Sequence, residues 1–430
     1  MLFNNLSVQN NTLYFAGMNT VELAKKYGTP LYLIDENYIE NAMQNYKNTV
    51  LKYFTPNSSI AFASKSLSYV DIYRTAKNAG IYADTVSPGE IFTALKAGFD
   101  PAKIFFHGNN KTDTDIEYAI KNNIGYFVLD NLEEIEAVDR IAKQNNIKQK
   151  AILRLSPGID PHTNKKVVTG NVDSKFGIAI ETNQAFEVVK HILTKQNIDF
   201  LGFHCHIGSQ IFDSEPFIDA SKAMFNFVLK TKNDLGYTTK IVNLGGGFGV
   251  RYHESQPVLD IDKILSEVSS VIKNICGEND IPIPDIFFEP GRSIVAAAGM
   301  TLYSVGSKKT ITGYKTYISI DGGMPDNPRY ALYQSLYSAI IANNADSPRS
   351  ITATIAGRCC ESGDLIQEDV PMQDCKRGDI LAVLVTGAYN YSMASNYNKL
   401  PRPPIVSIKN KTDRISVRRE SFEDLAKNEL

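Results

Sequence analysis

Short apolar or β-branched runs recur between residues 58 and 292 and alternate with stretches whose apolar residues follow helical spacing. The eight runs are IAFASK, YADTVS, IFFHGN, YFVLDN, ILRLSP, LGFHCHIG, VNLGGG and IFFEPGR. Amphipathic stretches at 70–79, 89–97, 131–143 and 219–232 separate several of them. Strands that alternate with helices at intervals of roughly 20 to 40 residues form βαβ units, and eight such units close a barrel. The pattern therefore predicts an α/β fold with a (β/α)8 TIM-like barrel.

The last part of the chain has a different residue pattern. It is rich in β-branched residues, apolar and polar positions alternate with a period of two, and Gly, Pro and Asp mark the turns. Its runs are MTLYSVGSKKTITGYKTYISI, RSITATIAG, GDILAVLVTG and PPIVSIKN. We expect a C-terminal antiparallel β-domain over residues 295–430, completed by short N-terminal strands within residues 1–29. The barrel domain is expected over 30–294. We interpret the run PLYLID at 30–35 as part of the connection between domains.

A long interval separates the fifth and sixth runs, from Ser156 to Asp199. It contains the segment PGIDPHTNKKVVTGNVDSKFG, which is rich in Pro, Gly, Asn and Asp. This composition predicts an extended loop at the barrel rim, where binding and catalytic groups commonly lie.

Composition narrows the class of protein. The 430 residues are 43% hydrophobic, enough for substantial cores, and 45 Lys plus Arg against 47 Asp plus Glu give a formal net charge of −2. A chain without a basic excess is not expected to bind nucleic acid. No targeting peptide or membrane span is expected, and the odd cysteine count predicts a reducing, cytoplasmic setting rather than a disulfide framework. The five cysteines are Cys205, Cys276, Cys359, Cys360 and Cys375.

Two glycine-containing loops predict a phosphate site. Barrel enzymes gather reactive groups at the C-terminal ends of their strands, and the loops after strands seven and eight commonly bind phosphate. Here these loops are GGGFG and EPGR. Gly245, Gly246 and Gly247 would let backbone N–H groups approach a phosphate, while Gly291 and Arg292 would add an amide and a cation. A simple tight turn is the alternative, and the place of the run after the seventh strand favours the phosphate site.

Lys65 and Glu289 end the first and eighth predicted strands. A buried or half-buried lysine with a lowered pKa can hold a carbonyl cofactor as a Schiff base, although most lysines at strand ends are solvated. An acidic group at the position of Glu289 can keep a pyridine nitrogen protonated, with a structural ion pair to an arginine as the alternative. Together with the phosphate loops, the two residues indicate pyridoxal 5′-phosphate.

His204 and His206 lie two apart on one predicted strand and therefore face the same way. A zinc pair is one interpretation, but no third ligand is suggested nearby and no metal is expected. Stacking of one imidazole on a planar cofactor is the better interpretation.

The motifs FASK, HCHIGSQ, NLGGGFG and EPGR resemble, in order and spacing, the fold-type III pyridoxal-phosphate decarboxylases, which include ornithine, arginine and diaminopimelate decarboxylases. The segments PGIDPHTN, DSKFG, DGGMPDNPRYALY, CCESGD and GAYNYSMASNYN are similar to those of the diaminopimelate decarboxylases within this family. The resemblance extends from about Pro30 to Pro403. One departure is the lysine segment FASKSLS, because relatives usually have a Tyr and an Ala-Asn flanking the lysine.

The resemblance implies a role for individual residues. Lys65 is implied as the Schiff-base lysine, Glu289 as the pyridine-nitrogen partner, His206 as the stacking imidazole and Cys360 as the proton donor, whereas Cys359 matches nothing catalytic. The implied cofactor-binding residues are Lys65, Asp84, His206, Ser209, Gly246, Gly247, Glu289, Gly291, Arg292 and Tyr389. The implied substrate-binding residues are Arg292, Arg329, Tyr333, Glu361 and Tyr389.

Each of these polar residues also has a plainer interpretation. Arg329 follows a proline in a loop and would be solvated if it had no ligand. Tyr333 and Tyr389 would be ordinary aromatics of the β-domain. Cys360 outside its ESGD context would be a small buried hydrophobe.

The resemblance implies decarboxylation of meso-2,6-diaminopimelate to L-lysine and CO2, the last step of lysine biosynthesis, by a homodimer with shared active sites. Arginines suit the distal carboxylate of this substrate, and Glu361 suits its ammonium group. Thiols have an unperturbed pKa of about 8.5, so a thiol can deliver a proton near neutral pH. The alternatives are a decarboxylase of ornithine, arginine, D-lysine or a carboxylated polyamine, an amino-acid racemase, or a non-catalytic homologue. Glu289 argues against the racemase, and the presence of Lys65 and Cys360 argues against the non-catalytic homologue.

Overall fold

The computed structural model describes residues 3–160 and 174–430 and divides the chain into two compact units. The barrel unit comprises Ala42–Gly249 and Val258–Gly291. The β unit comprises Met1–Asn41, Val250–Pro257 and Arg292–Leu430. Residues 161–173 of the expected rim loop lie outside the described part of the chain.

Eight parallel strands of the barrel unit pair in chain order and close on themselves. Closure is completed where β13 pairs with β5 through Phe287↔Ser59 and Phe288↔Ile60. All eight predicted runs are confirmed as strands, and so is the predicted (β/α)8 barrel. A short additional strand, β10 (Ile178–Ala179), pairs with β9. The barrel strands are β5 (Ser59–Ala63), β6 (Tyr82–Thr85), β7 (Ile104–Phe106), β8 (Tyr126–Leu129), β9 (Gln149–Ser156), β11 (Ile198–Cys205), β12 (Ile241–Asn243) and β13 (Asp285–Phe288).

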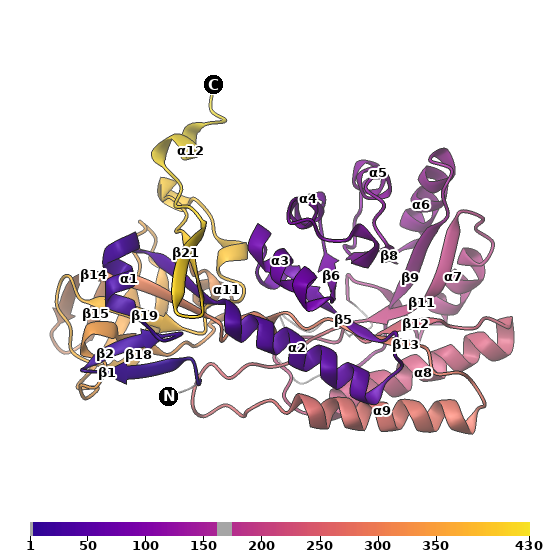
Figure 1. Ribbon diagram of the computed structural model, residues 1–430, viewed down its shortest axis with the longest axis horizontal. Coiled ribbons are helices and arrows are strands. Elements are labelled where there is room, and N and C mark those ends of the chain that lie inside the picture. The colour runs from indigo at the N-terminus through magenta and orange to yellow at the C-terminus, as the bar shows by residue number, and fades with distance from the viewer. Residues whose placement is uncertain (1–2, 161–173) are drawn as a thin grey trace. The chain divides into compact units, whose positions relative to one another are not determined.

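The helices of this unit lie outside the strands (Figure 1). They are α2 (Glu36–Tyr53), which begins in the β unit, α3 (Val70–Ala79), α4 (Pro88–Lys96), α5 (Asp113–Lys121), α6 (Leu132–Gln144), α7 (Gln184–Ile192), α8 (Glu215–Leu235) and α9 (Ile261–Glu278). Local sequence explains where several of them begin. The Ser87 side chain accepts the Glu90 N–H at the start of α4, and Thr112 and Asp115 form a capping box on α5.

Apolar side chains from most of the strands fill the interior of the barrel. Tyr82 and Tyr126 pack against this cluster, and the Phe105 and Tyr126 rings stack with their centroids 4.5 Å apart. A filled interior leaves only the ends of the barrel for polar chemistry. The buried cluster comprises Ala61, Phe105, Val128, Ile152, Leu201, Ile241 and Phe287.

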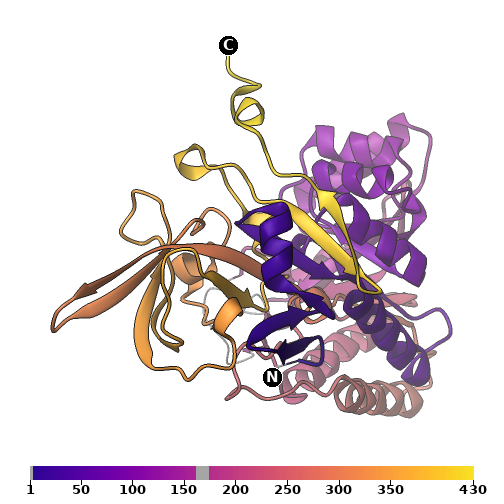
Figure 2. The same ribbon diagram turned by 60° about the vertical axis from the view of Figure 1, so that its left-hand side comes forward.

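The β unit contains two sheets. The smaller, antiparallel sheet is formed by β1 (Leu6–Gln9), β2 (Thr12–Phe15) and β3 (Met18–Asn19). The larger sheet has the order β18-β17-β15-β14-β4-β20-β21, with β19 paired to β14 and β16. Figure 2 shows the long β14–β15 hairpin that extends from it. Its strands are β4 (Leu31–Asp35), β14 (Gly299–Ile311), β15 (Lys315–Ile320), β16 (Ala339–Ile341), β17 (Ile351–Ala356), β18 (Leu365–Met372), β19 (Ile380–Leu384), β20 (Ile405–Lys409) and β21 (Thr412–Val417).

Three expectations about this unit need correction. The larger sheet is mixed rather than antiparallel, because β15 pairs in parallel with β17 and β4 in parallel with β20. The N-terminal strands form their own sheet instead of extending the larger one. The run PLYLID is not a connection: β4 lies between β14 and β20, and all five of its residues are buried.

The helices of the β unit are short. They are α1 (Thr20–Tyr27), α10 (Arg292–Val295), α11 (Arg329–Tyr333) and α12 (Phe422–Ala426). No helix in the described ranges is both long and apolar enough to cross a bilayer.

Candidate active site

Buried polar side chains gather at the carboxyl ends of the barrel strands. Asp84 lies in β6, His204 in β11 and Asn243 in β12, whereas His107 and Glu289 directly follow β7 and β13. Parallel strands bring all of these positions to one end of the barrel, the end at which barrel enzymes carry their active sites.

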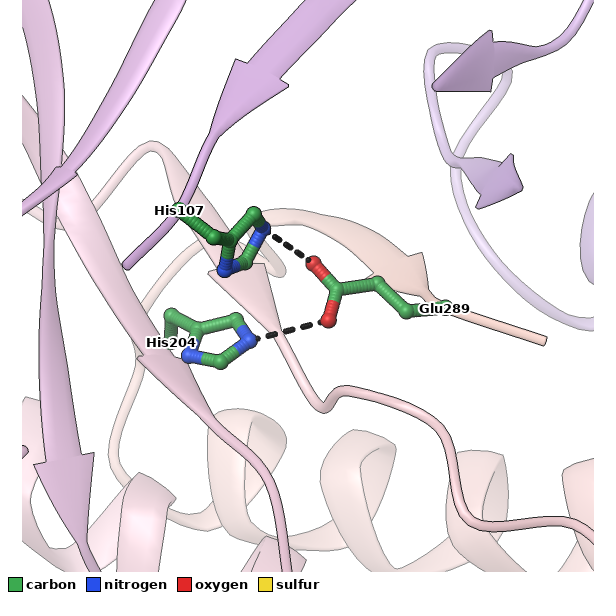
Figure 3. A group of neighbouring side chains, drawn as sticks. All are labelled: His107, His204 and Glu289. Carbon is green, nitrogen blue, oxygen red and sulfur yellow. Dashed lines mark hydrogen bonds and ion pairs between the residues drawn. The ribbon is translucent and has the colours of Figure 1, made fainter. Parts of the chain in front are cut away.

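The carboxylate of Glu289 is the centre of this group (Figure 3). Asn243 Nδ2 donates to Glu289 Oε1 at 2.7 Å. His107 Nε2 lies 2.9 Å from Oε1, and His204 Nε2 lies 3.0 Å from Oε2. Burial alone raises the pKa of Glu289, but the two imidazoles outweigh burial and hold this pKa well below its usual range. Glu289 is therefore ionised, and its partners are imidazoles and an amide rather than the arginine of the alternative interpretation.

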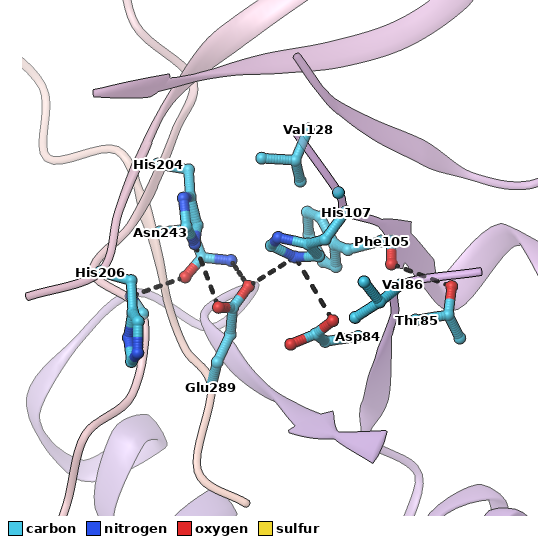
Figure 4. A network of polar contacts seen from close by, with 12 residues as sticks. Asp84, Thr85, Val86, Phe105, His107, Val128, His204, His206, Asn243 and Glu289 are labelled. Carbon is cyan, nitrogen blue, oxygen red and sulfur yellow. Dashed lines mark hydrogen bonds and ion pairs between the residues drawn. The ribbon is translucent and has the colours of Figure 1, made fainter. Parts of the chain in front are cut away.

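His107 lies between two carboxylates (Figure 4). Its Nε2 is 2.9 Å from Glu289 Oε1 and 3.8 Å from Asp84 Oδ1, and it is not aligned with either oxygen for a regular hydrogen bond. Burial raises the pKa of Asp84, and the His107 charge opposes this only in part. The two neighbouring carboxyl groups therefore differ: Glu289 is held ionised, while Asp84 is shifted towards its protonated form.

His204 is a neutral donor in this group. Burial lowers its pKa to about 4, so the ring carries no charge near neutral pH. Its contact with Glu289 then requires the proton on Nε2. The other ring nitrogen, Nδ1, is buried and has no hydrogen-bond partner within the described ranges.

Two backbone N–H groups of the glycine run after β12 form hydrogen bonds to side chains of the barrel unit. The Gly245 N–H donates to Asn243 Oδ1 at 2.9 Å, and the Gly246 N–H donates to His206 Nδ1 at 3.2 Å. Burial lowers the pKa of His206 well below its usual value, so the ring is neutral and its proton is on Nε2. Two of the three amides expected to face a phosphate therefore bind within the protein instead, which leaves that role to Gly247.

Glycine is required at two positions of this run because other parts of the backbone approach them closely. A Cβ on Gly246 would lie 2.1 Å from the Glu289 carbonyl oxygen, and one on Gly247 would lie 2.6 Å from the Gly208 carbonyl oxygen. Gly247 also has a φ of +109°, which side chains rarely adopt. Both positions therefore require glycine, which lets the loops after β11, β12 and β13 pack together at the end of the barrel that carries Lys65, His206 and Glu289.

Lys65 lies in a 3-10 turn, Ser64–Ser66, directly after β5. Its neighbours Ser64 and Ser66 are buried, whereas Lys65 itself is exposed, as most lysines at strand ends are. Lys65 nevertheless belongs to the same group of residues, because its charge is, after burial, the next largest cause of the lowered pKa of His206. An accessible amine beside a neutral imidazole suits attachment of a carbonyl cofactor.

The β unit holds a second group of candidate residues around Tyr389. The Arg292 guanidinium lies 4.8 Å from the ring centroid of Tyr389 and donates to Tyr252 Oη at 2.9 Å. The Arg329 guanidinium lies 5.4 Å from the same ring and 5.6 Å from that of Tyr333. The structure thus brings four of the predicted substrate-binding residues together and buries both arginines.

Arg329 is not the solvated loop residue of the plainer interpretation. It is only 6% exposed, and its Nη2 donates to Ser335 Oγ at 3.1 Å. Its Nε is buried without a hydrogen-bond partner, and Arg329 forms no ion pair with a carboxylate of the described ranges. A buried guanidinium without an anion is costly, so this arrangement suits an anionic ligand.

The predicted proton donor lies in another loop of the β unit. Cys360 and Glu361 are both exposed, and the Cys360 N–H donates to Asn398 Oδ1 at 2.8 Å. Within the described ranges, neither side chain forms a hydrogen bond or an ion pair with the arginines around Tyr389. The adjacent Cys359 differs from Cys360, because burial raises its pKa to about 12. Ser209 and Gly291, the remaining predicted residues, follow β11 and β13 in the barrel unit.

His107, Asn243 and Asp364 were not singled out from the sequence. His107 had a usable signal, because it directly follows an apolar run at the barrel end where the other candidates lie. The sequence also suggested no third metal ligand beside His204. The structure places His107 and Glu289 there, and their donor atoms and that of His204 lie within 4.8 Å of one another. His204 and Asn243 form hydrogen bonds to Glu289, and His107 Nε2 lies 2.9 Å from it.

Comparisons with known proteins agree with this site. Residues 36–296 match the pyridoxal binding domain of the pyridoxal-dependent decarboxylases. Diaminopimelate decarboxylase of Bacillus methanolicus is 42% identical over 408 residues, which cover 95% of this chain and 94% of that protein. The enzyme of Staphylococcus aureus (strain COL) is 42% identical over 427 residues, 98% of each chain.

Solved structures give the same result. The crystal structure of diaminopimelate decarboxylase from M. jannaschii superposes with a TM-score of 0.92 at 30% identity, covering 99% of this chain and 98% of that one. A structure of that protein with L-lysine has a TM-score of 0.90 at 31% identity and the same coverage. From these matches over nearly its whole length, the chain belongs to the diaminopimelate decarboxylase family, and its cofactor is pyridoxal 5′-phosphate.

Proposed function

We propose that this protein is a carboxy-lyase that converts meso-2,6-diaminopimelate to L-lysine and CO2, the last step of lysine biosynthesis. This choice of substrate rests on one observation about Arg329. Its guanidinium is buried, its Nε has no partner, and no carboxylate of the described chain pairs with it. Diaminopimelate differs from ornithine, arginine and lysine in its second carboxylate, which an arginine can bind in bidentate fashion. The solved relative with bound L-lysine accords with this product.

The residues of the barrel unit are proposed to bind the cofactor. Pyridoxal phosphate supplies an electron sink when bound. Lys65 would bind its aldehyde carbon, the ionised Glu289 would hold the proton on its ring nitrogen, and the neutral His206 would pack against its ring. Asp84, Ser209, Gly246, Gly247 and Gly291, with Arg292 and Tyr389 of the β unit, complete the proposed cofactor-binding set.

The β unit is proposed to supply the substrate contacts and a proton. Arg292 and Arg329 bind carboxylates, Tyr333 and Tyr389 pack beside them, and Glu361 binds the distal ammonium group. The Cys360 thiol delivers a proton to the carbon that has lost CO2. The neighbouring Cys359 cannot take this role readily, because its pKa is raised to about 12 and its thiol is half-buried.

We further propose a cytoplasmic homodimer in which Cys360 and Glu361 serve the active site of the other subunit. Both side chains are exposed, and all five cysteines are free thiols, as expected in a reducing compartment. Mixing Lys65→Ala with Cys360→Ala protein tests the sharing of sites. Activity that rises above that of either variant supports shared sites, and no rise overturns them.

The substrate assignment is tested by CO2 release from meso-diaminopimelate, ornithine, arginine, D-lysine and a carboxylated polyamine, with cofactor loading checked by absorbance. We expect release only from diaminopimelate, and Arg329→Gln should raise its KM by about 10- to 100-fold through loss of a charge-assisted contact. Arg349→Gln, on the surface, is the matched control. Preferential turnover of another substrate by loaded enzyme would overturn the proposal.

A further inference from the structure

We propose that His107 and His204 are positioning residues that fix the Glu289 carboxylate in one orientation and leave a single acceptor direction, on Oε2, for the ring nitrogen of the cofactor. This inference rests on the proposed role of Glu289. We call the group His107, His204 and Asn243 the carboxylate clamp.

The number of contacts on each oxygen supports this inference (Figure 4). A carboxylate offers about four lone-pair directions, two on each oxygen. Oε1 accepts a hydrogen bond from Asn243 Nδ2 at 2.7 Å and lies 2.9 Å from His107 Nε2, which is close but not aligned for a regular hydrogen bond. Oε2 faces one N–H group, His204 Nε2 at 3.0 Å. Within the described chain, the second direction of Oε2 is the one without a donor.

The charges explain why imidazole and amide donors are suitable here. A protonated pyridine nitrogen needs a carboxylate that keeps its negative charge. An arginine bound to Glu289 would neutralise that charge, whereas the amide of Asn243 and the neutral ring of His204 orient the carboxylate without cancelling it. Asn243 and His204 therefore orient Glu289 without neutralising it.

His107 has an additional place in this arrangement, because its Nε2 is nearer to Glu289 than to Asp84. It thereby favours a negative charge on Glu289 over one on Asp84, which burial shifts towards the protonated form. The other titratable or charged groups that interact electrostatically with Asp84 or Glu289 are Lys65, Tyr73, Glu90, Arg154, His204, Cys205 and His206. Arg154 and Lys65 act on these carboxylates through their charge, and within the described ranges neither forms a hydrogen bond to Glu289.

The test uses His107→Leu, which removes the donor, and His107→Gln, whose side-chain amide can replace the Nε2–H. Affinity of the ligand-free protein for pyridoxal phosphate is measured by fluorescence titration. We expect the dissociation constant to rise about 10- to 100-fold in His107→Leu. In His107→Gln it should return most of the way to the wild-type value. The pH at which the bound cofactor changes its absorbance should fall in His107→Leu, because a Glu289 carboxylate that is no longer fixed in one orientation contacts the ring-nitrogen proton less well.

His191→Leu is the matched control. His191 also pairs with a glutamate, Glu136, at 2.5 Å, but on the surface, so its loss should change neither affinity nor spectrum. His204→Gln provides a second variant if His107→Leu does not fold, as judged by its melting temperature.

Three results would overturn the inference. The first is that His107→Leu keeps the wild-type affinity and pH response. The second is a loss of affinity in His107→Leu that is equally large in His107→Gln, which would indicate that His107 acts through packing alone. The third is stoichiometric zinc in the purified protein that disappears in His107→Leu, because the clamp would then be a metal site. All of these readouts use the cofactor alone, so they are separate from a failure to decarboxylate diaminopimelate.

Discussion

Asp364 accepts the backbone N–H of Cys359 through its Oδ2, with the two atoms 2.7 Å apart. Its other oxygen, Oδ1, accepts the Met324 N–H at 2.6 Å. One carboxylate, 2% exposed, therefore joins the loop that carries Cys360 to the loop that leads to Arg329. The backbone is packed tightly around it, since a Cβ on Gly357 would lie 2.2 Å from Asp364.

We expect Asp364→Asn to lower both stability and turnover. Asparagine offers one acceptor oxygen in place of two, so one buried N–H loses its partner at a cost of about 1–3 kcal/mol. Loosening of the two loops should reduce kcat, because small misplacements of reacting groups are costly. Thermal unfolding and steady-state kinetics measure these effects. Asp374→Asn, at a surface pair with Lys308, should be near neutral; equal behaviour of the two variants would contradict the linking role of Asp364.

Gly246→Ala should abolish cofactor binding. Its Cβ would lie 2.1 Å from the Glu289 carbonyl oxygen, so the loop after β12 or the strand end at β13 must move. Gly277→Ala is the control, because it lies in α9 with no atom within 4 Å of its Cβ. That substitution should stabilise the helix by about 0.5–1 kcal/mol and keep the visible absorbance of the loaded enzyme. A loaded Gly246→Ala enzyme would contradict the close approach.

The two adjacent cysteines should respond differently to substitution. Cys360→Ala should keep the cofactor absorbance but lower kcat by about 10²- to 10⁴-fold, the usual contribution of a positioned acid. Cys359→Ala removes a half-buried thiol whose pKa is raised to about 12 and should leave kcat nearly unchanged. Stopped assays of CO2 release on both proteins measure the difference. If Cys359→Ala were the slower variant, the proton donor would have to be reassigned.

Stability should depend on pH through Asp326. Burial raises its pKa from 3.8 to about 7, and its carboxylate accepts from Tyr303 Oη and the Gly323 N–H. The folded chain thus binds a proton more tightly than the unfolded chain, so this stabilising effect is full below pH 3.8 and is lost as pH rises to about 7. The loss is about 1.4 kcal/mol per pH unit within that interval.

Asp326→Asn removes this titration. The free energy of unfolding is measured in urea from pH 4 to pH 8. As pH rises, the wild type should lose stability relative to Asp326→Asn, because only the wild type has this titration. Parallel pH curves for the two proteins would show that another group is responsible.

The barrel was largely predictable because its signals are local. Each strand is a short apolar run, and each turn after a strand carries polar or glycine residues that read directly from the sequence. The roles proposed for Lys65, Cys360 and Arg329 came from motifs whose residues are close in the chain, whereas the exposure of Lys65 depends on its surroundings in the fold and was left open by the sequence.

The missed features are non-local. β4 reads like any short apolar run, and only its pairing with β14 and β20 places it in the larger sheet. His107 acquires a role only because barrel closure brings β7, β11 and β13 to one end, beside Glu289. Asp364 likewise acts across loops that are distant in sequence.

The place of β4 has a consequence for synthesis on the ribosome. β4 emerges before the barrel, but its partners β14 and β20 emerge only after the last barrel strand has been made. The nearly continuous barrel segment can fold during translation, while the largely apolar strand β4 remains without its hydrogen-bonding neighbours. The nascent chain is therefore most prone to aggregation through this early strand, and completion of the larger sheet is one of the last folding events.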